Sequence, residues 1–173
     1  MVPRALPSWL VHVPRRAVGR AGGLLALAAF AAAGCAVRTH VVRSAALPVV
    51  TTLYVENNPA VFMSGLLPEM LTQLRTQGFH VVSYDGARPA GAVYRLTYTA
   101  NWKWHWAMYL SYFHVTFWRN DTVLGSAEYD ARRVGPNPDK YGPTAGKIRP
   151  LLLDLLKNVA RPSPAGPGGA IGS

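Results

Sequence analysis

A long stretch in the middle of the chain alternates between apolar and polar side chains and carries the clearest structural signal in the sequence. Residues 93–104 read VYRLTYTANWKW, in which apolar and polar positions follow one another strictly. A period of two is typical of a strand with one buried face and one wet face. We therefore expect a long strand, with Trp102 and Trp104 on the same buried face as Leu96.

The remaining apolar segments predict further strands and two helices. Segments rich in β-branched and aromatic residues predict strands at residues 49–56, 79–84, 108–118 and 122–129. Asn120 and Asp121 separate the last two strands as a tight hairpin turn. A period near 3.6 predicts helices at residues 67–77 and 144–159. Pro68 limits residues 60–64 to a separate helical turn, and Pro150 is expected to bend or start the second helix.

The order of these elements predicts an α+β fold. The first strand, helix and strand favour a parallel pair joined by a right-handed crossover. We expect a two-layer sandwich, β-α-β-β-β-β-α, in which a mixed, mostly antiparallel sheet of about five strands carries two helices on one face. One domain is expected over residues 49–160. Residues 161–173 are rich in Pro, Gly and Ser and predict a disordered tail.

The beginning of the chain has the composition of an export signal. Residues 1–20 carry four arginines and no acidic residue, and residues 21–33 are uncharged and mostly apolar. That apolar run is shorter than the ~20 residues of a membrane-spanning helix but has the length of a signal-peptide core. We expect residues 1–34 to be a signal peptide.

Cys35, the one cysteine of the chain, follows directly on small residues. It cannot form a disulfide within one chain. Ala32-Ala33-Gly34-Cys35 resembles a bacterial lipobox, in which the cysteine is acylated after cleavage before it. Cys35 is therefore the expected lipid anchor, with residues 35–48 as a tether. An uncleaved signal anchor and an ordinary signal peptide are the alternatives.

Sorting and charge extend this expectation. In lipoproteins an Asp after the cysteine commonly favours the inner membrane, whereas Ala36 stands here, so we expect the periplasmic face of the outer membrane. Removal of the four signal arginines from the formal charge of +10 leaves +6. The basic residues are scattered singly apart from Arg132-Arg133, which favours a solvated basic surface and no nucleic-acid site.

Four blocks of the domain resemble a known family. These are Glu56-Asn57-Asn58-Pro59, YTANWKW at residues 98–104, Ala107-Met108-Tyr109-Leu110, and GSAEYDA at residues 125–131. Together they resemble small, uncharacterised proteobacterial envelope lipoproteins of the Shewanella type. The resemblance covers roughly residues 53–156. It implies a lipoprotein in the cell envelope and transfers no catalytic residue.

Two clusters are candidate binding residues. Trp102, Trp104, His105 and Trp106 end the alternating strand, where exposed indoles could stack on a sugar, a peptide or a protein partner. Core packing is the alternative. Strand parity predicts that truncating Trp102 or Trp104 costs about 3–5 kcal/mol, whereas truncating Trp106 in the turn costs less than about 1 kcal/mol.

The second cluster is Asp130, Arg132 and Arg133, which follows the last strand. General acid chemistry is one interpretation, and a surface ion pair is the alternative. No cofactor is expected, and the histidines lack the spacing of a helical zinc site. Three functions remain open: a non-enzymatic envelope lipoprotein that docks a protein partner through its sheet edge or tryptophan loop, a small-ligand or glycan-binding module, and a hydrolase.

Overall fold

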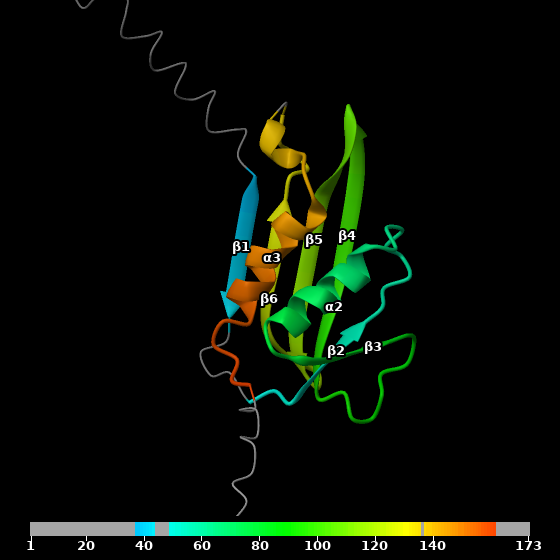
Figure 1. Ribbon diagram of the computed structural model, residues 1–173, viewed down its shortest axis with the longest axis vertical. Coiled ribbons are helices and arrows are strands. Elements are labelled where there is room, and N and C mark those ends of the chain that lie inside the picture. Colours follow the sequence, from blue (N-terminus) through cyan, green and yellow to red (C-terminus); the bar gives the residue numbers. More distant parts are fainter. Residues whose placement is uncertain (1–36, 44–48, 136, 162–173) are drawn as a thin grey trace, which may run out of the picture. The chain divides into compact units, whose positions relative to one another are not determined.

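The computed structural model describes residues 37–43, 49–135 and 137–161. Within them, six strands form one sheet in the order β1-β6-β5-β4-β2-β3 (Figure 1). The strands are β1 (Arg38–Arg43), β2 (Thr52–Glu56), β3 (His80–Tyr84), β4 (Tyr94–His105), β5 (Ala107–Arg119) and β6 (Thr122–Asp130). The helices are α2 (Leu66–Thr76) and α3 (Thr144–Leu155), with a short 3-10 turn, η1 (Pro138–Lys140), between β6 and α3.

The connections confirm the expected α+β fold. β2 pairs with β3 in parallel through the α2 crossover, and β4, β5 and β6 form antiparallel hairpins. β2 is also parallel to β4, but only Tyr54 and Val55 pair there, with Arg95 and Leu96. The β5–β6 turn consists of Asn120 and Asp121, as the sequence predicts.

β1 is a strand more than the sequence predicts, and it lies within the stretch expected to be a tether. It pairs antiparallel with β6 along its whole length, from Arg38 opposite Asp130 to Arg43 opposite Gly125. Only Val41 of this strand is partly buried, so the segment has almost no apolar alternation to mark it.

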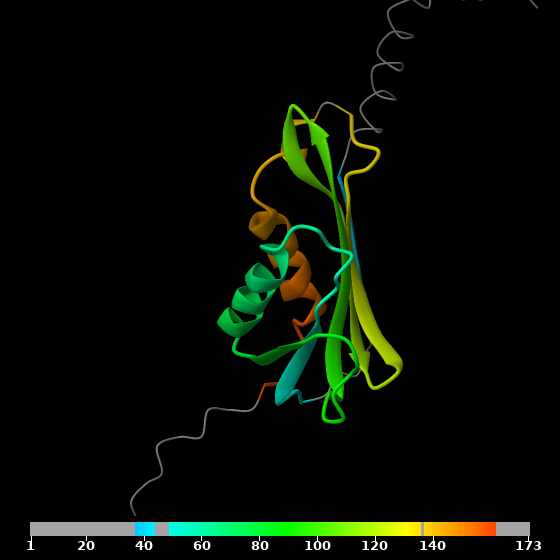
Figure 2. The same cartoon turned by 90° about the vertical axis from the view of Figure 1, so that its right-hand side faces the viewer.

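Both helices cover the same face of the sheet (Figure 2). α2 begins at Leu66, which places Pro68 in the first turn, where its missing N–H needs no partner. α3 continues through Pro150, which is exposed to solvent. Beneath the helices the core includes Leu96 of β4 and Phe113 and Phe117 of β5, all with no exposed surface.

Candidate functional site

The β4–β5 turn presents large apolar side chains to solvent. Trp104 is 72% exposed, Trp106 is 87% exposed, and Met108, opposite Trp104 in the hairpin, is 47% exposed. Trp106 forms the turn itself with φ 65°, a left-handed conformation that bulky residues rarely adopt. Such backbone strain is concentrated at functional sites, so the turn is a candidate binding surface.

The expectation that Trp104 is buried is wrong, whereas Trp102 does pack against the core. Both follow the parity of Leu96, but the hairpin extends beyond the ends of α2 and α3 (Figure 2). Trp102 is half-buried because Phe62, from the loop before α2, lies against it edge-on with ring centroids 5.4 Å apart. No such cover reaches Trp104, so its indole remains in solvent.

His105 fastens the turn to the segment that follows η1. The Tyr141 hydroxyl donates a hydrogen bond to the His105 carbonyl oxygen at 2.7 Å and lies 2.6 Å from His105 Nδ1. Because the hydroxyl has only one proton, Nδ1 must donate in the second contact. The two rings also stack, with centroids 6.4 Å apart. Lys140, which is buried, lies over the Tyr141 ring and donates to the Gly135 carbonyl. His105 is therefore a positioning residue for the turn.

A second apolar surface lies beside the outer half of β4, and the sequence gives little warning of it. Phe62 is 64% exposed and Met63 is also exposed; with Trp102 they form what we call the apolar shelf. A pocket of about 300 Å³ adjoins the shelf between Met63, Trp102 and the start of α3. The available signal was two adjacent large apolar residues, Phe62 and Met63, outside the periodic stripe of α2.

The edge of β4 next to this shelf is open. β2 reaches only as far as Leu96, and no other strand in the described part of the chain pairs with β4 on that side. The Asn58 side chain donates to the Tyr98 carbonyl oxygen at 2.8 Å and so occupies one backbone acceptor. An open strand edge can pair with an added strand.

Asp130 and Arg132 form a bidentate ion pair. Arg132 Nε and Nη2 donate to the two carboxylate oxygens at 2.9 and 2.7 Å, and the Arg132 backbone N–H donates at 2.9 Å. The hydrogen bonds from Arg132 lower the pKa of Asp130 from 3.8 to about 2. The Arg132 guanidinium also lies 4.1 Å from the Tyr112 ring centroid. A carboxyl with so low a pKa stays ionised and is a poor proton donor near neutral pH.

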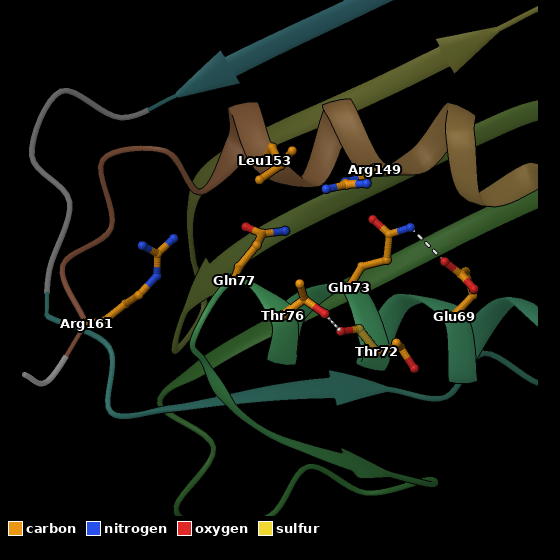
Figure 3. A pocket seen from close by; sticks show the side chains of 8 residues that line it. All are labelled: Glu69, Thr72, Gln73, Thr76, Gln77, Arg149, Leu153 and Arg161. Atoms are coloured by element: carbon orange, nitrogen blue, oxygen red, sulfur yellow. Dashed lines mark hydrogen bonds between the residues drawn. The ribbon is translucent and has the colours of Figure 1, made fainter. Parts of the chain in front are cut away.

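A pocket of about 470 Å³ lies between α2 and α3 (Figure 3). Arg149 and Arg161 stand at it, and its one carboxylate, Glu69, accepts a hydrogen bond from Gln73 at 2.7 Å. The carboxamide of Gln77 is buried and has no hydrogen-bond partner among the described residues. The two hydroxyls of the lining, on Thr72 and Thr76, each donate to a backbone carbonyl oxygen of α2 at 2.9 Å.

Several predictions concern residues that the structure does not describe. Cys35, the signal peptide and residues 162–173 of the expected tail lie outside them. Within the described ranges, no cluster of His, Cys, Asp and Glu could hold a metal ion. No helix in those ranges is long and apolar enough to cross a membrane.

Comparison with known proteins adds one distant structural likeness. No protein-family model matches the chain, and no curated protein matches it. Among solved structures, a PelC variant crystallised as a dodecamer, from Paraburkholderia phytofirmans, is similar over 70% of this chain and 95% of that one. The identity is 14% and the TM-score is 0.43.

Proposed function

We propose that this chain is a bacterial envelope lipoprotein, held by acyl chains on Cys35 at the periplasmic face of the outer membrane, whose domain binds a protein partner without catalysing a reaction. The lipobox-like segment and the resemblance to Shewanella-type lipoproteins support the proposed location in the cell envelope. The ion pair of Asp130 with Arg132 supports a role without catalysis, because Asp130 is the candidate general acid and its carboxylate is held by Arg132.

The observation that carries partner binding is the open edge of β4 beside the apolar shelf. An extended segment of a partner could add to that edge through main-chain hydrogen bonds, and its side chains could enter the pocket beside Met63 and Trp102. Exposed apolar groups next to an unpaired edge are otherwise a hazard for aggregation, so covering them has a physical benefit.

The anchor is tested by Cys35→Ser in the full chain. We expect loss of labelling by radioactive palmitate and release from the membrane fraction, because two or more acyl chains provide stable attachment. Outer-membrane recovery of the unaltered protein on a sucrose gradient tests its sorting. A Cys35→Ser protein that loses its signal peptide and still pellets with membranes would contradict the anchor.

Partner binding is tested by photo-crosslinking in intact cells. A benzoylphenylalanine in place of Phe62 should give a discrete heavier product, and Met63→Asp in the same chain should abolish it. The matched control places the crosslinker at Val123, an exposed apolar position at the β5–β6 turn. Crosslinking of similar yield at both positions, or none at Phe62, would refute the proposed surface.

A further inference from the structure

The register of the sheet places the tryptophan turn and the start of β1 at the same end of the domain. Arg38 lies opposite Asp130, Asp130 opposite Tyr112, and Tyr112 opposite Asn101, so these four residues form one row across the sheet. β4 and β5 continue past this row to the turn at Trp106. Figure 1 shows the first residues of β1 and the β4–β5 turn at one end.

Chain length then limits how far Cys35 can lie from that row. Arg38 follows Cys35 by three positions in the chain, a distance of at most about 10 Å when fully extended. The five steps along the chain from Asn101 to Trp106 advance about 16 Å in strand conformation. The turn therefore extends farther from this row than Cys35 can reach. With the strands perpendicular to the membrane, an acylated Cys35 cannot keep the turn out of the bilayer.

The side chains at this end suit a lipid surface. Trp104 and Trp106 present exposed indoles, a group that concentrates at the level of the lipid headgroups. Lys103, Arg38 and Arg133 at the same end are exposed cations that can contact anionic headgroups. Of the acidic residues near them, Asp130 is already paired with Arg132 and Asp139 lies in η1.

We propose that the β4–β5 turn inserts the indoles of Trp104 and Trp106 into the interfacial layer of the bilayer that holds the acyl chains of Cys35. This contact rests on the proposed anchor at Cys35. It gives the domain two attachments to one membrane, which fixes its orientation and keeps the open edge of β4 beside the lipid surface.

The test uses the full acylated protein reconstituted in vesicles of phosphatidylethanolamine and phosphatidylglycerol. Flotation of the vesicles first reports whether the protein is anchored. Lipids brominated near the headgroup end of the acyl chains then quench tryptophans that lie in the interface. We expect strong quenching in the unaltered protein and loss of most of it in the double variant Trp104→Phe with Trp106→Phe.

The matched control is Trp118→Phe, because Trp118 lies on β5 toward the opposite end of the sheet and donates to Thr97. This variant should be quenched as fully as the unaltered protein. If the protein floats with the vesicles but the fluorescence of Trp104 and Trp106 is not quenched, the insertion of the turn is refuted and the anchor is not. This is the result expected if the two indoles bind a protein or a glycan. Failure to float would refute the anchor and the inserted turn together.

Discussion

β4 joins two regions of the sheet that differ in what covers them. Leu96 and Trp104 lie on the same face of the same strand, yet Leu96 is completely buried and Trp104 is 72% exposed. α2 and α3 lie over the first region, while the hairpin continues beyond them. The difference shows that alternation fixes which way a side chain points, whereas burial depends on a second layer that alternation does not report.

The largest expected effect is in the covered region. Leu96→Ala should lower the free energy of unfolding by about 3 kcal/mol, because it removes apolar contacts and leaves a cavity beneath the helices. Urea unfolding followed by circular dichroism measures this. A loss below about 1 kcal/mol would mean that this part of the sheet is not held by its cover.

Trp102 stands at the boundary, and its loss should cost an intermediate amount. Trp102→Ala should destabilise by about 2 kcal/mol, because the indole is only half-buried against the core and Phe62. A double-mutant cycle with Phe62→Ala should give a coupling energy of about 1 kcal/mol for the edge-to-face pair. Additive losses would show that the apolar shelf contributes no stability of its own.

At the uncovered end an ion pair replaces apolar burial. Asp130→Asn should cost about 1 kcal/mol near neutral pH, a modest amount because the pair is partly exposed. The pKa of Asp130 is lowered from 3.8 to about 2, so its contribution is complete above the ordinary value and disappears as pH falls to about 2. Unfolding curves of both proteins between pH 7 and pH 2 should therefore converge. A difference that stays constant with pH would contradict this origin.

The smallest effect is expected at the projecting indole. Trp104→Ala should change the free energy of unfolding by no more than about 0.5 kcal/mol, because the side chain is mostly in water in both states. The same urea curves measure it. A cost equal to that of Trp102→Ala would show that the hairpin tip belongs to the core, and the comparison between the two regions would fail.

Much of the fold follows from local sequence patterns. The strand at Tyr94–His105, the α2 crossover and the turn at Asn120 and Asp121 agree with what alternation, helical period and turn chemistry predict. The sequence does not predict β1, because this strand is held by main-chain pairing with β6 and has almost no apolar pattern of its own. Local propensity cannot show pairing with a strand more than 80 residues away in the chain.

The candidate surfaces followed from sequence only in part. The sequence alternation locates Trp104, His105 and Trp106 at the end of a strand and predicts a turn there. In the structure Trp106 forms this turn and adopts a left-handed conformation. Which indole is exposed depended on where α2 and α3 end. The apolar shelf depended on a loop that brings Phe62 onto Trp102 across 40 positions, and no local pattern reports such a contact.

Gly125 bears on how far the domain could lie from the proposed anchor at Cys35. A Cβ at this position would lie 2.5 Å from the Val42 carbonyl oxygen and 3.0 Å from Leu155 Cδ1, so only glycine lets β1 lie this close to β6. With β1 in place, the chain that follows the proposed anchor at Cys35 joins the sheet at Arg38. Without β1, the first main-chain hydrogen bond to the rest of the domain would be the one that the Val50 N–H donates to the Ala160 carbonyl oxygen. The chain between Cys35 and that point could then extend to about 50 Å. Under the proposed anchoring, the absence of a side chain at Gly125 therefore keeps the domain close to the membrane that holds Cys35.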